Sequence, residues 1–189
     1  MSFVNYAKSA GKDLGQGILE KDSGFVPVID SDHARVHNDQ MFQNFQENLA
    51  LANNGTVLFE YIVPADKALH LKGMSAWVTE QHWRFELIAA PTLTTGATPL
   101  ANKPFHWPST IVNPIVCKSN PTGISGGTVI ASSLFGGGSG VGQTIIAGNA
   151  SKALEHELGA GTYLVRITNL SGGAAKISAN LFWYFTYED

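Results

Sequence analysis

Two β-rich runs near the end of the chain are separated by a single short turn. The runs are residues 162–168 and 176–187, and the turn between them reads Asn169-Leu-Ser-Gly-Gly173. Thr, Tyr, Val, Ile, Phe and Trp suit the half-buried surface of a pleated sheet, and Ser-Gly-Gly allows the positive φ angles that a sharp reversal needs. The pattern predicts a closing hairpin whose last strand is built into a sheet.

Strand-like segments continue upstream of this hairpin, separated by short turns that often contain Gly or Pro. The segments are residues 56–63, 69–79, 82–89, 110–118, 128–135 and 143–147. With the closing hairpin they give about eight to ten strands, at a spacing typical of an antiparallel sandwich or barrel. No alternation of strands and helices is visible, so the chain is expected to be all-β.

Residues 38–51 carry two overlapping patterns. Apolar side chains at helical spacing are Met41, Phe42, Phe45 and Leu49. However, Phe42, Asn44 and Gln46 begin the alternation of a strand, and Asn53-Asn-Gly55 ends the segment as a hairpin turn would. The residues leave helix and strand both open, and the family resemblance given below favours the strand.

Residues 1–24 are expected to form an extended N-terminal arm. Gly11, Gly15, Gly17 and Gly24 lie too close together for a stable helix or strand. Five apolar side chains are scattered among the polar ones and are predicted to contact a neighbouring protein: Phe3, Tyr6, Leu14, Ile18 and Leu19. The alternative is a loosely ordered terminus. A single β-sandwich domain is expected to span residues 25–189, with a short edge strand at 25–29.

Charged residues are scarce, at 14% of the chain, compared with roughly 25% in a typical soluble domain. Between Leu87 and Leu154 the charged residues are Lys103, Lys118 and Lys152. Charged groups are depleted at the centres of protein interfaces. This region is therefore expected either to meet another protein surface or to form Gly/Ser/Thr loops.

Charge and hydropathy argue against several classes of function. The net charge is −3 and no segment is strongly basic, so a nucleic-acid groove is not expected. No apolar run approaches the roughly 18 residues of a spanning helix, and the first residues do not resemble a signal peptide, so no membrane partner is expected. The lone Cys117 is predicted to be a buried small hydrophobe, with a reactive thiol as the alternative, and folding in a reducing cytoplasm fits this.

Two motifs resemble catalytic or metal sites without completing them. Gly123-Ile-Ser-Gly-Gly127 matches the nucleophile elbow around a serine, but a strand is predicted to follow it, which favours a glycine turn. His33 and His37 lie among three aspartates, although a metal site needs three or four converging ligands. No catalytic, cofactor-binding or metal residue is assigned, and the chain is not expected to be an enzyme.

Two aromatic segments could bind a sugar. They are His-Trp-Arg-Phe at residues 82–85 and Phe-His-Trp at residues 105–107. Aromatic rings exposed together on one surface can stack on ligands. Aromatic residues that alternate with polar ones more often face the core, and this is the interpretation we favour here.

Three blocks of the chain resemble a group of tailed-phage virion proteins. One is the closing hairpin itself, with Tyr163-Leu-Val-Arg-Ile-Thr-Asn-Leu-Ser-Gly172 followed by a last strand that contains Trp183-Tyr184. The others are Asp30-Ser-Asp-His-Ala-Arg-Val-His37 and Ala68-Leu-His-Leu-Lys-Gly-Met-Ser-Ala-Trp77. The resemblance touches most of residues 25–188. It is to proteins of the capsid cement or decoration type, and it implies a jelly-roll-like antiparallel β-sandwich.

The resemblance also implies a structural function. The protein would be made in the cytoplasm of a bacterial host and would bind the exterior of the assembled capsid. Its partners would be the major capsid protein and other copies of itself, as a dimer or trimer, and it would reinforce contacts between capsid subunits. The alternatives are a phage tail or fibre protein that binds a host glycan and, third, a β-sandwich hydrolase that uses Ser125.

Overall fold

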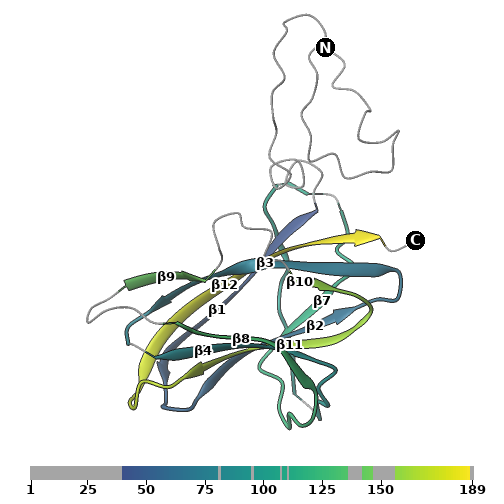
Figure 1. The fold of residues 1–189 in the computed structure, drawn as a ribbon. Helices are drawn as coiled ribbons and strands as arrows, with labels where there is room; N and C mark the ends of the chain where they lie inside the picture. The colour runs from purple at the N-terminus through teal and green to yellow at the C-terminus, as the bar shows by residue number, and fades with distance from the viewer. Residues whose placement is uncertain are drawn as a thin grey trace, which may run out of the picture.

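The protein is a β-sandwich of two antiparallel sheets. The structure, a computed structural model, describes residues 40–80, 82–94, 96–106, 108–109, 111–135, 142–146 and 156–187, and for 142–146 the backbone alone. In Figure 1 the two sheets lie one above the other, with loops hanging below the lower sheet. An all-β sandwich is therefore confirmed. The jelly-roll connectivity, the arm at residues 1–24 and the domain boundary at residue 25 stay predictions.

Sheet A has β3 (Lys67–Val78), β12 (Ala175–Tyr187) and β1 (Met41–Leu51) at its centre. At one margin β6 (Lys103–Pro104) pairs with β1, and at the other β10 (His156–Leu158) and β9 (Gly142–Ile146) both pair with β3. The strand order in sheet B is β5 (Thr98–Pro99), β7 (Val116–Ser119), β2 (Thr56–Val63), β11 (Gly161–Asn169), β4 (Trp83–Ala89) and β8 (Thr128–Phe135).

The predicted closing hairpin is wrong: both of its strands are present, but they do not pair with each other and lie in different sheets. Along β12, Ile177, Ala179, Leu181 and Trp183 are fully buried and alternate with half-exposed or exposed neighbours. β11 lies in sheet B between β2 and β4, while β12 lies in sheet A between β3 and β1. The turn at residues 170–173 therefore connects the two layers of the sandwich. It is not the tight reversal of a paired hairpin.

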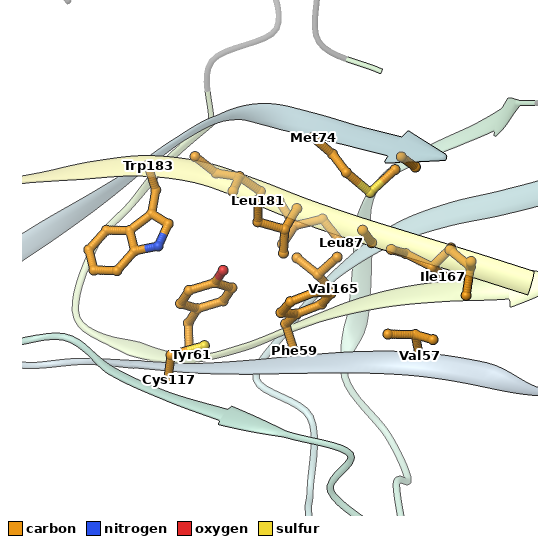
Figure 2. Close-up of a cluster of buried hydrophobic side chains, with 14 of the residues drawn as sticks. Val57, Phe59, Tyr61, Met74, Leu87, Cys117, Val165, Ile167, Leu181 and Trp183 are labelled. Atoms are coloured by element: carbon orange, nitrogen blue, oxygen red, sulfur yellow. The ribbon is translucent and has the colours of Figure 1, made fainter. Parts of the chain in front are cut away.

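Side chains from both sheets fill the space between the layers. Figure 2 shows Trp183 and Leu181 of sheet A directed toward Tyr61 and Phe59 of sheet B. Trp183 also contacts Phe42, with ring centroids 5.1 Å apart. Burying a side chain of this size stabilises the fold by about 1.5–3 kcal/mol, so the core accounts for much of the sandwich's stability.

Residues 41–51 form the strand β1, so the strand that the family resemblance favoured is confirmed and the helix is wrong. Phe42, Asn44 and Gln46 point inward and are buried, whereas Phe45 and Glu47 are exposed. The helical spacing was misleading because two inward positions of the strand are polar. Their side chains are accommodated by hydrogen bonds inside the sandwich, which the sequence pattern does not reveal.

The predicted strand at residues 110–118 is wrong in its first half, because β7 begins at Val116. The side chain of Asn113 accepts a hydrogen bond from the Ile115 N–H at 2.8 Å, and Pro114 has no N–H to give to a ladder. Together they turn the chain, so that Ile115 enters the core while Ile111 and Val112 remain exposed.

Candidate interaction surfaces

Ser125 lies in the loop between β7 and β8 and pairs with Thr92 through backbone hydrogen bonds of 3.0 and 2.8 Å. The glycines of its motif allow close packing. A Cβ on Gly123 would lie 1.6 Å from Thr94 Oγ1, and one on Gly127 would lie 2.8 Å from a methyl carbon of Ile88. The next element is the strand β8, which begins at residue 128. The glycine pattern is therefore explained by loop packing, and the motif does not form the strand-to-helix turn of a nucleophile elbow.

Within the part of the chain that the structure describes, no group of three His, Cys, Asp or Glu side chains could hold a metal ion. The histidine and aspartate cluster at residues 30–39 lies outside the described residues, so its prediction is untested. Cys117 is buried, as predicted, beside Tyr61 (Figure 2). Burial raises the pKa of the Cys117 thiol to about 12, which keeps it protonated and unreactive at neutral pH.

The two aromatic segments belong to different sheets. Trp83 on β4 is fully buried, and Phe85 packs against the same core. Phe105 follows β6 at the margin of sheet A, where it is 40% exposed and its ring centroid lies 5.8 Å from that of Phe182. Trp107 lies outside the described residues. The described residues of these segments, 82–85 and 105–106, therefore do not combine into one aromatic platform.

The outer face of sheet B, which points away from sheet A, carries two ion pairs across neighbouring strands. Arg166 Nε donates to Glu86 Oε2 at 2.8 Å, and Lys118 Nζ lies 3.6 Å from Glu60 Oε1. Both carboxylates are largely buried and neutralised by these partners. Loop residues cover the middle of this face, where Ile124 packs on an apolar cluster of Leu58, Ile88 and Leu164.

Exposed apolar side chains remain near β7 and on β8. Near β7 they are Val116, on the strand itself, and Ile111 and Val112 in the irregular segment before it; we call these three the 111–116 cluster. Val112 is the most exposed of them, at 88%. Val116 lies opposite Ile62 of β2, one position from the inward-facing pair Cys117 and Tyr61, so it belongs to the outer face.

One margin of sheet B is formed by β8. Its sequence, Thr-Val-Ile-Ala-Ser-Ser-Leu-Phe, contains no charge and no proline. It pairs with β4, and no strand in the described part of the chain pairs with its other side. Val129, Ile130 and Leu134 are exposed, and Leu134 is 72% exposed. β8 is separated from β7 by four strand spacings, which is roughly 19 Å.

The sequence predicted that the charge-poor region between Leu87 and Leu154 either meets another protein or forms loops. It did not single out the exposed apolar residues of β8 or of the 111–116 cluster within that region. Their sequence predicted strands at residues 110–118 and 128–135, but it did not predict which side chains would stay exposed. An apolar run without strict alternation, such as Val129-Ile130, was the available signal. The five arm residues predicted to contact a partner lie outside the described residues, so that prediction is untested.

No described helix is long and apolar enough to cross a membrane. Comparison with models of known protein families finds no match, and comparison with curated protein sequences finds none. The function is therefore inferred from the residues and from their arrangement in the sandwich.

Proposed function

We propose that this protein is a structural component of a phage virion. It binds the exterior of the assembled capsid and reinforces contacts between major capsid subunits. The proposal combines the resemblance of three sequence blocks to virion proteins with one structural observation, namely the exposed, uncharged apolar side chains beside β7 and on β8.

Exposed apolar side chains that lie together are a common feature of surfaces that bind other proteins. The 111–116 cluster fits such a contact because no charged residue occurs between Lys103 and Lys118. Lys118 is already engaged with Glu60, so covering the cluster would not strand an unpaired ammonium group. A hydrophobic hollow at a junction between capsid subunits is the complementary surface.

Reinforcement follows from binding to the assembled state alone. A ligand that binds only the assembled state stabilises it by mass action, by about 2.7 kcal/mol per site at a free concentration one hundred times the dissociation constant. Many copies on one particle multiply this effect. No chemical step is required, so the protein acts through the number and affinity of its contacts.

The test compares two exposed apolar residues in a capsid-binding assay. Val112→Lys places a charge in the 111–116 cluster, whereas the matched control Leu49→Lys makes the same kind of change on sheet A. We expect Val112→Lys to weaken capsid binding at least about tenfold and to lower the temperature at which decorated capsids rupture. Leu49→Lys should bind like the wild type. Wild-type protein that neither binds capsids nor raises their rupture temperature would refute the proposed function.

One observation favours a second candidate, a tail or fibre protein that binds a host glycan. Phe105, Phe182 and the exposed Phe45 lie on the outer face of sheet A, where Asn180 donates a hydrogen bond to Gln43 at 2.6 Å. Rings beside amides can recognise a sugar. A glycan array that detects a ligand whose binding is lost in Phe105→Ala, together with no capsid binding, would favour this candidate over the first.

A further inference from the structure

The margins of the two sheets are protected unequally. β5 and β6 are two residues long and contain Pro99 and Pro104, β10 is three residues long and carries a glutamate, and β9 has five residues. β8 has eight residues with neither charge nor proline. Short strands, proline and charge are the usual protections of sheet edges against pairing with another chain. Among the described margins, β8 is therefore the one built least like a protected edge.

β8 is also chemically self-complementary. Its register with β4 places Ser132 beside Glu86 and Leu134 beside Arg84, so Ser132 and Leu134 lie on the outer face. In an antiparallel pair of two β8 strands with Ser132 opposite Ser132, Leu134 lies opposite Ile130 of the other copy. Both are exposed in the single chain, at 72% and 44%. The pairing would cover them with each other while the small serines meet at the axis.

The neighbouring charges do not oppose this arrangement. The residue of β4 beside Ser132 is Glu86, whose carboxylate Arg166 neutralises at 2.8 Å. Two copies of Glu86 would be three strand spacings apart, about 14 Å, and each would keep its own arginine. A partner strand with charged side chains would find no opposite charge on β8 to pair with. A second copy of β8 is an uncharged strand of matching shape.

We propose that β8 is a homodimer interface, in which two copies pair antiparallel about a two-fold axis at Ser132 and join their B sheets into one. The pairing does not depend on the capsid function. If both hold, the dimer carries a 111–116 cluster at each outer end, which would let one dimer bridge two capsid subunits and bind with avidity.

One irregularity limits the pairing to part of the strand. The register between β4 and β8 shifts between Leu87 and Ile88, which leaves Ile130 as an extra residue on β8. Pairing with β4 is continuous from Ala131 to Phe135. We therefore expect the dimer ladder to be regular from Ala131 to Ser133 and to reach the bulge at the Leu134–Ile130 pairs, so the dimer should be reversible.

The first experiment is sedimentation equilibrium of the purified full chain over a concentration series, without capsids. The wild type should shift with concentration from the monomer mass of 20.2 kDa toward twice that mass. Leu134→Lys should raise the dissociation constant at least about tenfold, because each dimer would place two ammonium groups in the seam. Val112→Lys, in the irregular segment that precedes β7, should dimerise like the wild type. Circular dichroism and the melting temperature establish that both variants are folded.

The second experiment tests the register by oxidative cross-linking of single cysteines. Directly opposite residues have Cα atoms about 4.5–5.5 Å apart, within reach of a disulfide, so Ser132→Cys should cross-link to itself. The matched control Ser133→Cys is also exposed, but it would lie diagonally from its copy at roughly 7–8 Å and should cross-link poorly. Wild type, whose Cys117 is buried, should not cross-link.

The proposal is overturned by any of three results: a wild type that stays monomeric at the highest concentration, a dimer unaffected by Leu134→Lys, or preferential cross-linking of Ser133→Cys. A monomer whose Leu134→Lys variant loses capsid binding would assign β8 to the capsid contact. A dimer that does not bind capsids would support the pairing and refute only the proposed function.

Discussion

At the residue scale, Asn44 holds parts of the sandwich that are distant in sequence. Its side-chain oxygen accepts hydrogen bonds from the Trp183 indole N–H at 2.6 Å and the Tyr61 hydroxyl at 3.1 Å. Its amide donates to Ala101 O at 2.9 Å and to Asn102 Oδ1 at 2.8 Å. All four hydrogen-bonding positions of this buried amide are used, which is why a polar residue is tolerated inside the core.

We expect Asn44→Leu to destabilise the fold by about 2–6 kcal/mol, because it leaves the Tyr61 hydroxyl and the Trp183 N–H buried without this acceptor. The measurement is the free energy of unfolding in urea. Asn48→Leu is the matched control on the same strand, where the side chain makes a local hydrogen bond to the Ala50 N–H. Its cost should stay below about 1 kcal/mol. Equal costs for the two variants would contradict the role given to Asn44.

Cys117 should make the fold sensitive to alkaline pH. Burial raises its pKa from 9.0 to about 12, while the thiol of the unfolded chain keeps an ordinary pKa. Below pH 9 both states hold the proton. Above pH 9 the unfolded chain releases it first, so stability falls as pH rises toward 12, by about 1.4 kcal/mol per pH unit at most. The pKa of buried Tyr61 is raised as well, mainly by burial, which adds a loss at still higher pH.

The test is to measure the free energy of unfolding of wild type and Cys117→Ala at pH 8 and pH 10. The variant should lose about 1.3 kcal/mol less than the wild type over this interval, because its unfolded chain has no thiol to ionise at this position. The comparison subtracts the titration of lysines and tyrosines that both proteins share. Equal losses would mean that Cys117 titrates in the folded protein as it does in the unfolded chain.

At the element scale, β12 is the strand on which sheet A depends most. It pairs with β1 on one side and β3 on the other, and its inward side chains cross to sheet B. Ile167 of β11 and Ile177, Leu181 and Trp183 of β12 belong to the core between the two sheets. Leu164 and Tyr184 are also buried, but on outer faces, where Leu164 lies under a loop and Tyr184 stacks on His70 at 4.3 Å.

Trp183→Ala should cost about 3–5 kcal/mol, because it removes a fully buried indole and leaves a cavity between the sheets. The adjacent Phe182→Ala is the control, since Phe182 points to the outer face and is only half-buried. Thermal and urea unfolding of both variants should show the larger loss for Trp183. An unchanged melting temperature in Trp183→Ala would show that the last strand is peripheral to the core.

At the scale of the whole molecule, the contacts proposed at β8 and at the 111–116 cluster are separate from the contact that the sequence predicts for the first residues. The apolar residues Phe3, Tyr6, Leu14, Ile18 and Leu19 could each contribute up to about 1.5–3 kcal/mol if a partner supplied pockets for the larger side chains. The residues between them are polar or glycine, so residues 1–24 have little other apolar surface with which to pack against the β-sandwich.

Deleting residues 1–24 should therefore leave the β-sandwich folded and weaken its attachment to capsids. The melting temperature of the truncated protein should stay near that of the full chain, and the dissociation constant for capsids should rise. A control in which the same five apolar residues are changed to serine within the full-length chain separates loss of side chains from loss of length. Full capsid binding by the truncated form would remove the arm from the contact.

The sequence by itself determined the strands whose alternation is strict and the class of fold they form. In β12 every second residue from Ile177 to Trp183 is apolar, and a period of two allows one strand face to be buried whatever its partners are. The same local logic predicted β2, β3, β4 and β11 to within a few residues. The alternation predicts a strand without knowledge of which strands pair with it, so residues distant in sequence are not needed for this prediction.

Only the tertiary structure decided which apolar residues are covered. Phe59 and Leu134 both lie in strand-like text, yet Phe59 is buried at the centre of sheet B and Leu134 is exposed at its margin. Asn44 likewise becomes a core residue because Trp183, 139 positions away, meets it across the sheet. Burial and hydrogen-bond satisfaction depend on what packs against a residue, and these neighbours are brought together by strand order, which local periodicity does not encode.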